Sequence, residues 1–102
     1  MNKTLIDAAK EQLLRGLVLT LLKQTEPEGG SLELLQSVLK TSGYDLTREH
    51  LLTTLTYLTD KGLVMSRTVE NKQLNISRFI TKLTSKGVDL LEGTIQVEGI
   101  MV

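Results

Sequence analysis

The apolar residues in the first quarter of the chain recur at the spacing of a helix face. At intervals of three or four positions stand Ile6, Ala9, Leu13, Leu17 and Leu21. This period predicts a helix over 5–24. Leu14 and Val18 widen the stripe, while Leu19 and Leu22 fall outside it, so apolar side chains cover most of the circumference. Such a helix is either buried on several sides or shared with a second subunit.

Two further helices follow a loop that a helix cannot easily continue through. The segment 26–30 reads EPEGG, and proline and paired glycines interrupt helical structure. Ser31 is a suitable N-cap for a helix over 32–41, and Thr47 for a helix over 48–61. In the third helix Leu51, Leu55 and Leu58 form the expected core face, and Gly62 follows its end.

The pattern then changes from helical to extended. We predict strands over 63–69 and 73–83 around a polar tip at 70–72, because β-branched residues are frequent in this stretch. Thr84 or Ser85 then caps a short helix that ends at Gly93. A short strand between the first two helices would complete a three-stranded sheet. The expected fold is one α+β domain over 1–102, with an apolar tail at 94–102 packed on the first helix or on a second subunit.

Composition and charge are those of an ordinary globular domain. Apolar residues make up 40% and charged residues 24% of the 102 residues, and the net charge is zero. The charges are unevenly distributed, however. Residues 1–47 carry five basic and six acidic residues, residues 48–86 seven and three, and residues 87–102 none and three. The basic excess therefore lies in residues 48–86 and is concentrated in and around the predicted hairpin.

The residue types present speak against catalysis and metal binding. There is no cysteine, and His50 is the sole histidine, so neither a thiolate site nor a cluster with metal-ligand spacing exists. No phosphate-binding glycine motif and no Ser/His/Asp arrangement is present. We therefore expect no enzyme activity, no cofactor and no metal. With no signal peptide, no membrane-spanning run and no need for an oxidising compartment, we expect a cytoplasmic protein.

Two sequence segments carry a resemblance to a known family. Residues 60–64 read DKGLV and residues 83–91 read LTSKGVDLL. Both resemble winged helix-turn-helix DNA-binding domains of the ArsR/MarR-like type. The resemblance implies a three-helix core, a two-stranded β-hairpin wing and a short C-terminal helix. The ending VDLLEGTIQVEGIMV is also similar to small winged-helix proteins of Mu-like phages and prophages, which would imply a phage regulatory or assembly role.

In winged-helix regulators the third helix enters the major groove of DNA and the wing contacts the backbone. Carried onto this sequence, the candidate DNA-binding residues are Arg48, His50, Thr53, Thr56, Tyr57, Lys61, Arg67, Lys72 and Arg78. Glu49 and Asp60 lie on the same helix face and would repel phosphates. The helix face can also be read as merely solvated, and the cations of the hairpin as protection of a sheet edge against aggregation.

The surplus apolar residues predict a subunit interface. The candidate homodimer residues are Leu5, Leu19, Leu22, Ile95, Val97 and Ile100. The alternative is that the tail covers the first helix within one subunit. The leading functional hypothesis is binding of double-stranded DNA as a regulatory phage or prophage protein. The second is a winged-helix protein–protein interaction module, such as an adaptor in phage assembly or packaging, that binds a phage protein and no DNA.

Overall fold

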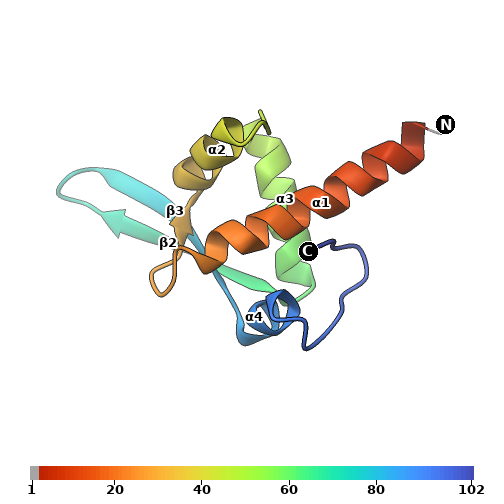
Figure 1. The fold of residues 1–102 in the computed structure, drawn as a ribbon. Coiled ribbons are helices and arrows are strands. Elements are labelled where there is room, and N and C mark those ends of the chain that lie inside the picture. The colour runs from red at the N-terminus through yellow and green to blue at the C-terminus, as the bar shows by residue number, and fades with distance from the viewer. Residues whose placement is uncertain (1–2) are drawn as a thin grey trace.

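The computed structural model describes residues 3–102, so the first two residues of the predicted domain lie outside it. Over this range the chain forms four helices and one three-stranded antiparallel sheet (Figure 1). In chain order the elements are α1 (Lys3–Lys23), β1 (Gly30–Ser31), α2 (Leu32–Thr41), α3 (Arg48–Asp60), β2 (Val64–Asn71), β3 (Ile76–Leu83) and α4 (Ser85–Leu91). The predicted α+β class is confirmed.

Hydroxyl side chains begin three of the helices, as the sequence predicted. Ser31 Oγ accepts a hydrogen bond from the Leu34 amide at 3.1 Å, and Thr47 Oγ1 accepts one from the His50 amide at 3.0 Å. Thr84 Oγ1 accepts from the Gly87 amide at 3.2 Å and donates to the Gly62 carbonyl at 2.6 Å. Each hydroxyl satisfies an amide that the first helical turn leaves without a partner.

The sheet has the order β1–β3–β2, and the long hairpin of β2 and β3 extends away from the helices (Figure 1). The short strand expected between the first two helices is present, with Ser31 opposite Ile80. The tip differs from the prediction, because β2 continues to Asn71 and the turn occupies 72–75. Asn71 Oδ1 accepts from the Leu74 amide at 3.1 Å, and Asn75 adopts a positive φ of 52°, which together close the turn there.

The core is built from leucine and valine where α1, α2 and α3 meet the inner face of the sheet. Its buried members are Leu14, Val18, Leu19, Leu22, Leu32, Leu35, Leu39, Leu51, Leu55, Leu58, Leu63, Val64, Leu83 and Leu90. The apolar stripe predicted for α1 is buried only in part: Leu14 and Val18 lie in the core and Leu17 and Leu21 pack against it. Leu13 is 45% exposed and Ile6 is 38% exposed, whereas Leu19 and Leu22 are fully buried. Because both sides of α1 are apolar, packing against α2, α3 and the sheet decides which side is buried.

Candidate nucleic-acid interface

The third helix, α3, presents its polar residues on two different sides. Leu51, Leu55 and Leu58 face the core, and Thr54 is buried among them with its hydroxyl donating to the His50 carbonyl at 3.1 Å. The remaining polar residues divide into a side that faces α1 and the tail, and an outward side. This division separates the residues that the sequence had assigned to a single DNA-contacting face.

The side facing α1 is already occupied by other parts of the chain. His50 Nε2 lies 2.8 Å from Glu11 Oε1 of α1. The Arg15 guanidinium lies over the half-buried Tyr57 ring, with its Cζ 3.7 Å from the ring centroid. The Lys61 Nζ lies 5.4 Å from the same centroid. His50 and Tyr57 are therefore held in intramolecular contacts, although the His50 side chain is still 41% exposed, and their contact with DNA stays a prediction.

The outward side of α3 is exposed and carries negative charge. Thr53 and Thr56 are exposed, as predicted, and so are Glu49 and Asp60, which share this side by their helical spacing. Hydroxyl groups can donate to phosphate or base edges, whereas carboxylates repel phosphate and can accept only from donors such as the cytosine amine. The outward side therefore offers few favourable contacts to a DNA backbone.

Two of the candidate arginines converge on one carboxylate. Arg48 at the start of α3 places Nη1 3.7 Å from Glu33 Oε2, and Arg78 of β3 places Nη1 3.2 Å from Glu33 Oε1. Glu33 lies in the first turn of α2, so three elements meet at this point. The structure thus brings Arg48 and Arg78 together, 30 residues apart in the chain, around an acid that the sequence analysis did not single out.

The outer face of the hairpin gathers positive charge. Residues directly opposite each other in an antiparallel pair point to the same face, and the register pairs Arg67 with Ile80, Lys82 with Met65, and Arg78 with Val69. Arg67 and Arg78 are exposed and Lys82 is partly exposed. Among the described strand positions on this face none is acidic. We call Arg67, Arg78, Lys82 and their apolar neighbours the outer sheet face.

Lys72 lies at the exposed tip of the hairpin, beyond the outer sheet face. On the inner face of the same strands, near the core, the Ser66 and buried Thr81 hydroxyls lie 2.8 Å apart and satisfy each other. Lys82 was not among the predicted contact residues. Its alternation with Arg78 and Ile80 is the sequence signal that places it on the same face.

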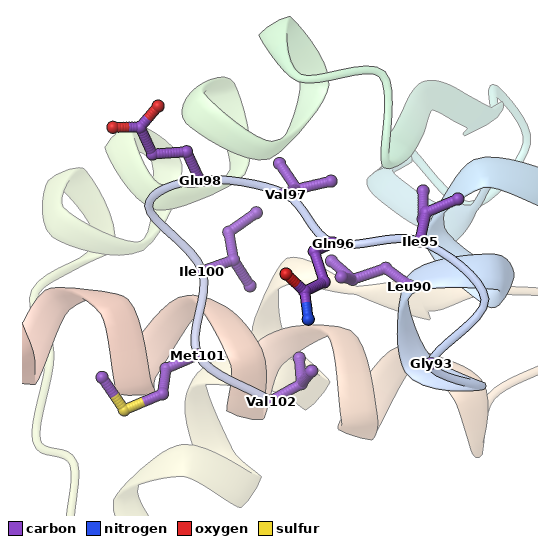
Figure 2. A pocket seen from close by; sticks show the side chains of 9 residues that line it. All are labelled: Leu90, Gly93, Ile95, Gln96, Val97, Glu98, Ile100, Met101 and Val102. Atoms are coloured by element: carbon purple, nitrogen blue, oxygen red, sulfur yellow. The ribbon is translucent and has the colours of Figure 1, made fainter.

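The C-terminal tail packs on α1 and α3 of its own chain. Arg15 Nη1 donates to the Gly99 carbonyl at 2.9 Å, and the Met101 amide donates to the Gln12 carbonyl at 3.1 Å. Figure 2 shows the tail as an arch from α4 back to α1, around an open cavity of about 520 Å³ lined mainly by the tail itself. Glu98 points away from the arch (Figure 2).

These contacts change the predicted homodimer surface. Leu19 and Leu22 are fully buried within one chain, so assigning them to a subunit interface is wrong. The tail residues Ile95, Val97 and Ile100 are partly buried against the chain's own core. Leu5 is 68% exposed, near the end of α1 that projects beyond the body (Figure 1).

The described residues form neither a metal-binding cluster nor a membrane-spanning helix. Within residues 3–102, no three His, Asp or Glu side chains come together in a way that could hold a metal ion. Every helix in the same range is too short or too polar to cross a membrane. The feature of the molecule with a clear chemical preference is therefore electrostatic, namely the outer sheet face and the Arg48–Glu33–Arg78 cluster beside it.

Comparison with known proteins adds no assignment. No family model, no curated protein and no solved structure matches this chain.

Proposed function

We propose that this chain is a winged-helix DNA-binding protein whose hairpin makes most of the phosphate contacts. The observation that carries the proposal is the outer sheet face, where Arg67, Arg78 and Lys82 project from paired strands with no acidic residue among those strand positions. Arginine and lysine neutralise backbone phosphates, and this term supplies most non-specific DNA affinity. The element order, with α2 and α3 followed directly by the hairpin, supports the same proposal.

In this proposal α3 approaches the major groove with Thr53 and Thr56, while the hairpin holds the backbone. Glu49 and Asp60 limit how many phosphates α3 itself can contact. Lys72 at the hairpin tip adds a further cation. A regulatory role in a phage or prophage, which the resemblance to small winged-helix proteins of Mu-like phages implies, belongs to the same proposal.

The test is a fluorescence anisotropy titration of a labelled duplex of about 20 base pairs. Three phosphate contacts give a slope of about −2.7 in log affinity against log salt, so affinity falls roughly 40-fold between 50 and 200 mM. Arg67→Glu should weaken binding and flatten this slope. Lys10→Glu is the matched control, because Lys10 is an exposed lysine in the half of α1 that projects on the side away from the hairpin (Figure 1). Absence of binding at 50 mM, or equal losses in both variants, contradicts the proposal.

We also propose that the protein forms a homodimer through the projecting half of α1. Leu5, Ala9 and Leu13 repeat every four residues on one side of this helix, and both leucines are strongly exposed. An antiparallel pair of helices with its two-fold axis at Ala9 would place Leu5 against Leu13 of the second copy. A helical segment this short is only marginally stable alone, so a partner would stabilise it.

Sedimentation velocity over a range of concentrations tests the dimer. Leu13→Glu should leave a monomer at every concentration, because it places a charge in the apolar contact. Asp7→Lys is the control, since Asp7 is exposed on another side of the same helix. A wild-type protein that is monomeric at about 100 μM, well above the concentrations at which specific dimers associate, would contradict the dimer.

A second candidate function is protein–protein interaction without DNA. It is favoured by the net negative outward side of α3, where Glu49 and Asp60 are exposed. A partner with a basic surface would then bind α3. If this is correct, Glu49→Lys abolishes capture of the partner from nuclease-treated lysate while Arg67→Glu does not. Retention of DNA by the wild-type protein would favour the first proposal.

A further inference from the structure

The Arg48–Glu33–Arg78 cluster joins three elements through one carboxylate. Glu33 of α2 accepts a hydrogen bond from Arg78 of β3 at 3.2 Å and lies 3.7 Å from Arg48 of α3. The three side chains are between 47% and 57% exposed. The cluster is thus open to solvent, with two positive charges facing a single negative one.

Two arginines around one anion make a site that suits a phosphate as well as a carboxylate. The planar guanidinium group binds both anions in the same bidentate geometry. Its hydrogen bonds to phosphate are among the stronger ones in proteins. An exposed ion pair contributes little to stability, because water screens it and its side chains lose conformational freedom. Replacing Glu33 by a better anion therefore costs the fold little.

We infer that Arg48 and Arg78 form one binding site for a phosphate of the DNA backbone, and that Glu33 occupies this site in the free protein. The inference rests on the proposed DNA binding and concerns its regulation. Glu33 is an internal competitor: it keeps the two arginines oriented toward one point, and it lowers DNA affinity because it must be displaced. The site joins the start of α3 and the first turn of α2 to β3 of the hairpin, so it would fix the position of the duplex relative to these three elements.

The experiment measures duplex affinity and its salt dependence for Glu33→Gln against wild type. Removing the competing charge should tighten binding at 50 mM salt roughly tenfold, because the ion pairs of Glu33 no longer have to be broken before the phosphate binds. The log–log slope should stay close to that of wild type, because the same phosphate contact forms in both complexes. Glu92→Gln is the matched control, since it removes an exposed acid at the end of α4, away from the proposed DNA contacts, that forms no ion pair within residues 3–102. It should change affinity much less.

Arginine variants make the test specific. Arg48→Gln and Arg78→Gln should each weaken binding, and the gain from Glu33→Gln should disappear when both are combined with it, because the three groups share one site. Circular dichroism and thermal unfolding establish that each variant is folded. A gain that persists without the two arginines, or a gain equal to that of Glu92→Gln, overturns the inference.

The outcomes separate this inference from the proposed function. If wild type binds duplex DNA with the expected salt dependence and Glu33→Gln binds no more tightly, the inference fails while DNA binding stands. If neither wild type nor Glu33→Gln binds at 50 mM salt, DNA binding fails, and the phosphate site fails with it.

Discussion

Replacing Gly99 by alanine should detach the tail from the helices it packs on. Gly99 has a φ of +90°, and a Cβ placed there would overlap the Tyr57 hydroxyl. The same residue offers its carbonyl to Arg15, whose guanidinium also lies over the Tyr57 ring. A single methyl group therefore disturbs the backbone, the ring and the guanidinium together.

The magnitude follows from these contacts. An alanine in the left-handed region costs about 1–2 kcal/mol. Losing the hydrogen bond from Arg15 adds about 1.5 kcal/mol, the lower end for a charged donor because the group is only partly buried. Loss of the ring contact adds about 0.5 kcal/mol. We expect the free energy of unfolding to fall by about 3–4 kcal/mol.

Gly43→Ala is the matched control, because Gly43 has a φ of +96° with nothing within 4 Å of the added Cβ. The free energy of unfolding of this variant should fall only by the cost of an alanine in the left-handed region, about 1–2 kcal/mol. Urea unfolding gives the free energy of unfolding of both variants, and we expect the two values to differ by about 2 kcal/mol. The melting temperature of Gly99→Ala should therefore be roughly 10 °C lower than that of Gly43→Ala. A Glu-specific protease should also cut faster after Glu98 in that variant. Equal losses in the two variants, within about 0.5 kcal/mol, would refute the reasoning.

Two further predictions concern the fold that carries the hairpin. Leu58 is fully buried in α3, so Leu58→Ala should cost about 2–5 kcal/mol in urea unfolding; a loss below 1 kcal/mol would show that this site is not packed. Thr84→Ala should cost about 1–2 kcal/mol, because the hydroxyl caps α4 and also bonds the Gly62 carbonyl. Thr84→Ser should restore most of that loss, and failure to do so would contradict the capping role.

Local signals in the sequence predicted the elements well. Ser31, Thr47 and Thr84 begin helices where expected, since a cap acts on amides only two or three residues ahead. The alternation of β3 also holds, and it would have placed Lys82 on the same face as Ile80 and Arg78. Such features depend on neighbours in the chain, which the sequence displays directly.

Features that depend on distant partners could not be predicted in the same way. His50 is paired with a residue 39 positions away, and Arg15 with one 84 positions away. Nothing in the third helix indicates that one polar side will be covered by α1 and the tail. Ile6 and Leu13 belong to the predicted apolar stripe of α1 but are exposed for a related reason. Apolar residues occupy more than one side of this helix, and only tertiary packing decides which of them are buried.

The distribution of charge has a consequence for the kind of DNA binding proposed. Base sequence is read by donors and acceptors that reach base edges, chiefly from a helix in the major groove. Here the outward side of α3 carries Thr53 and Thr56 between the carboxylates of Glu49 and Asp60. The basic side chains lie instead on the hairpin and at Arg48, the start of α3. Because contacts to phosphate carry no sequence information, binding led by the hairpin would tolerate many sequences. Discrimination would then have to come from a second copy, which fixes the spacing of two such contacts along the duplex.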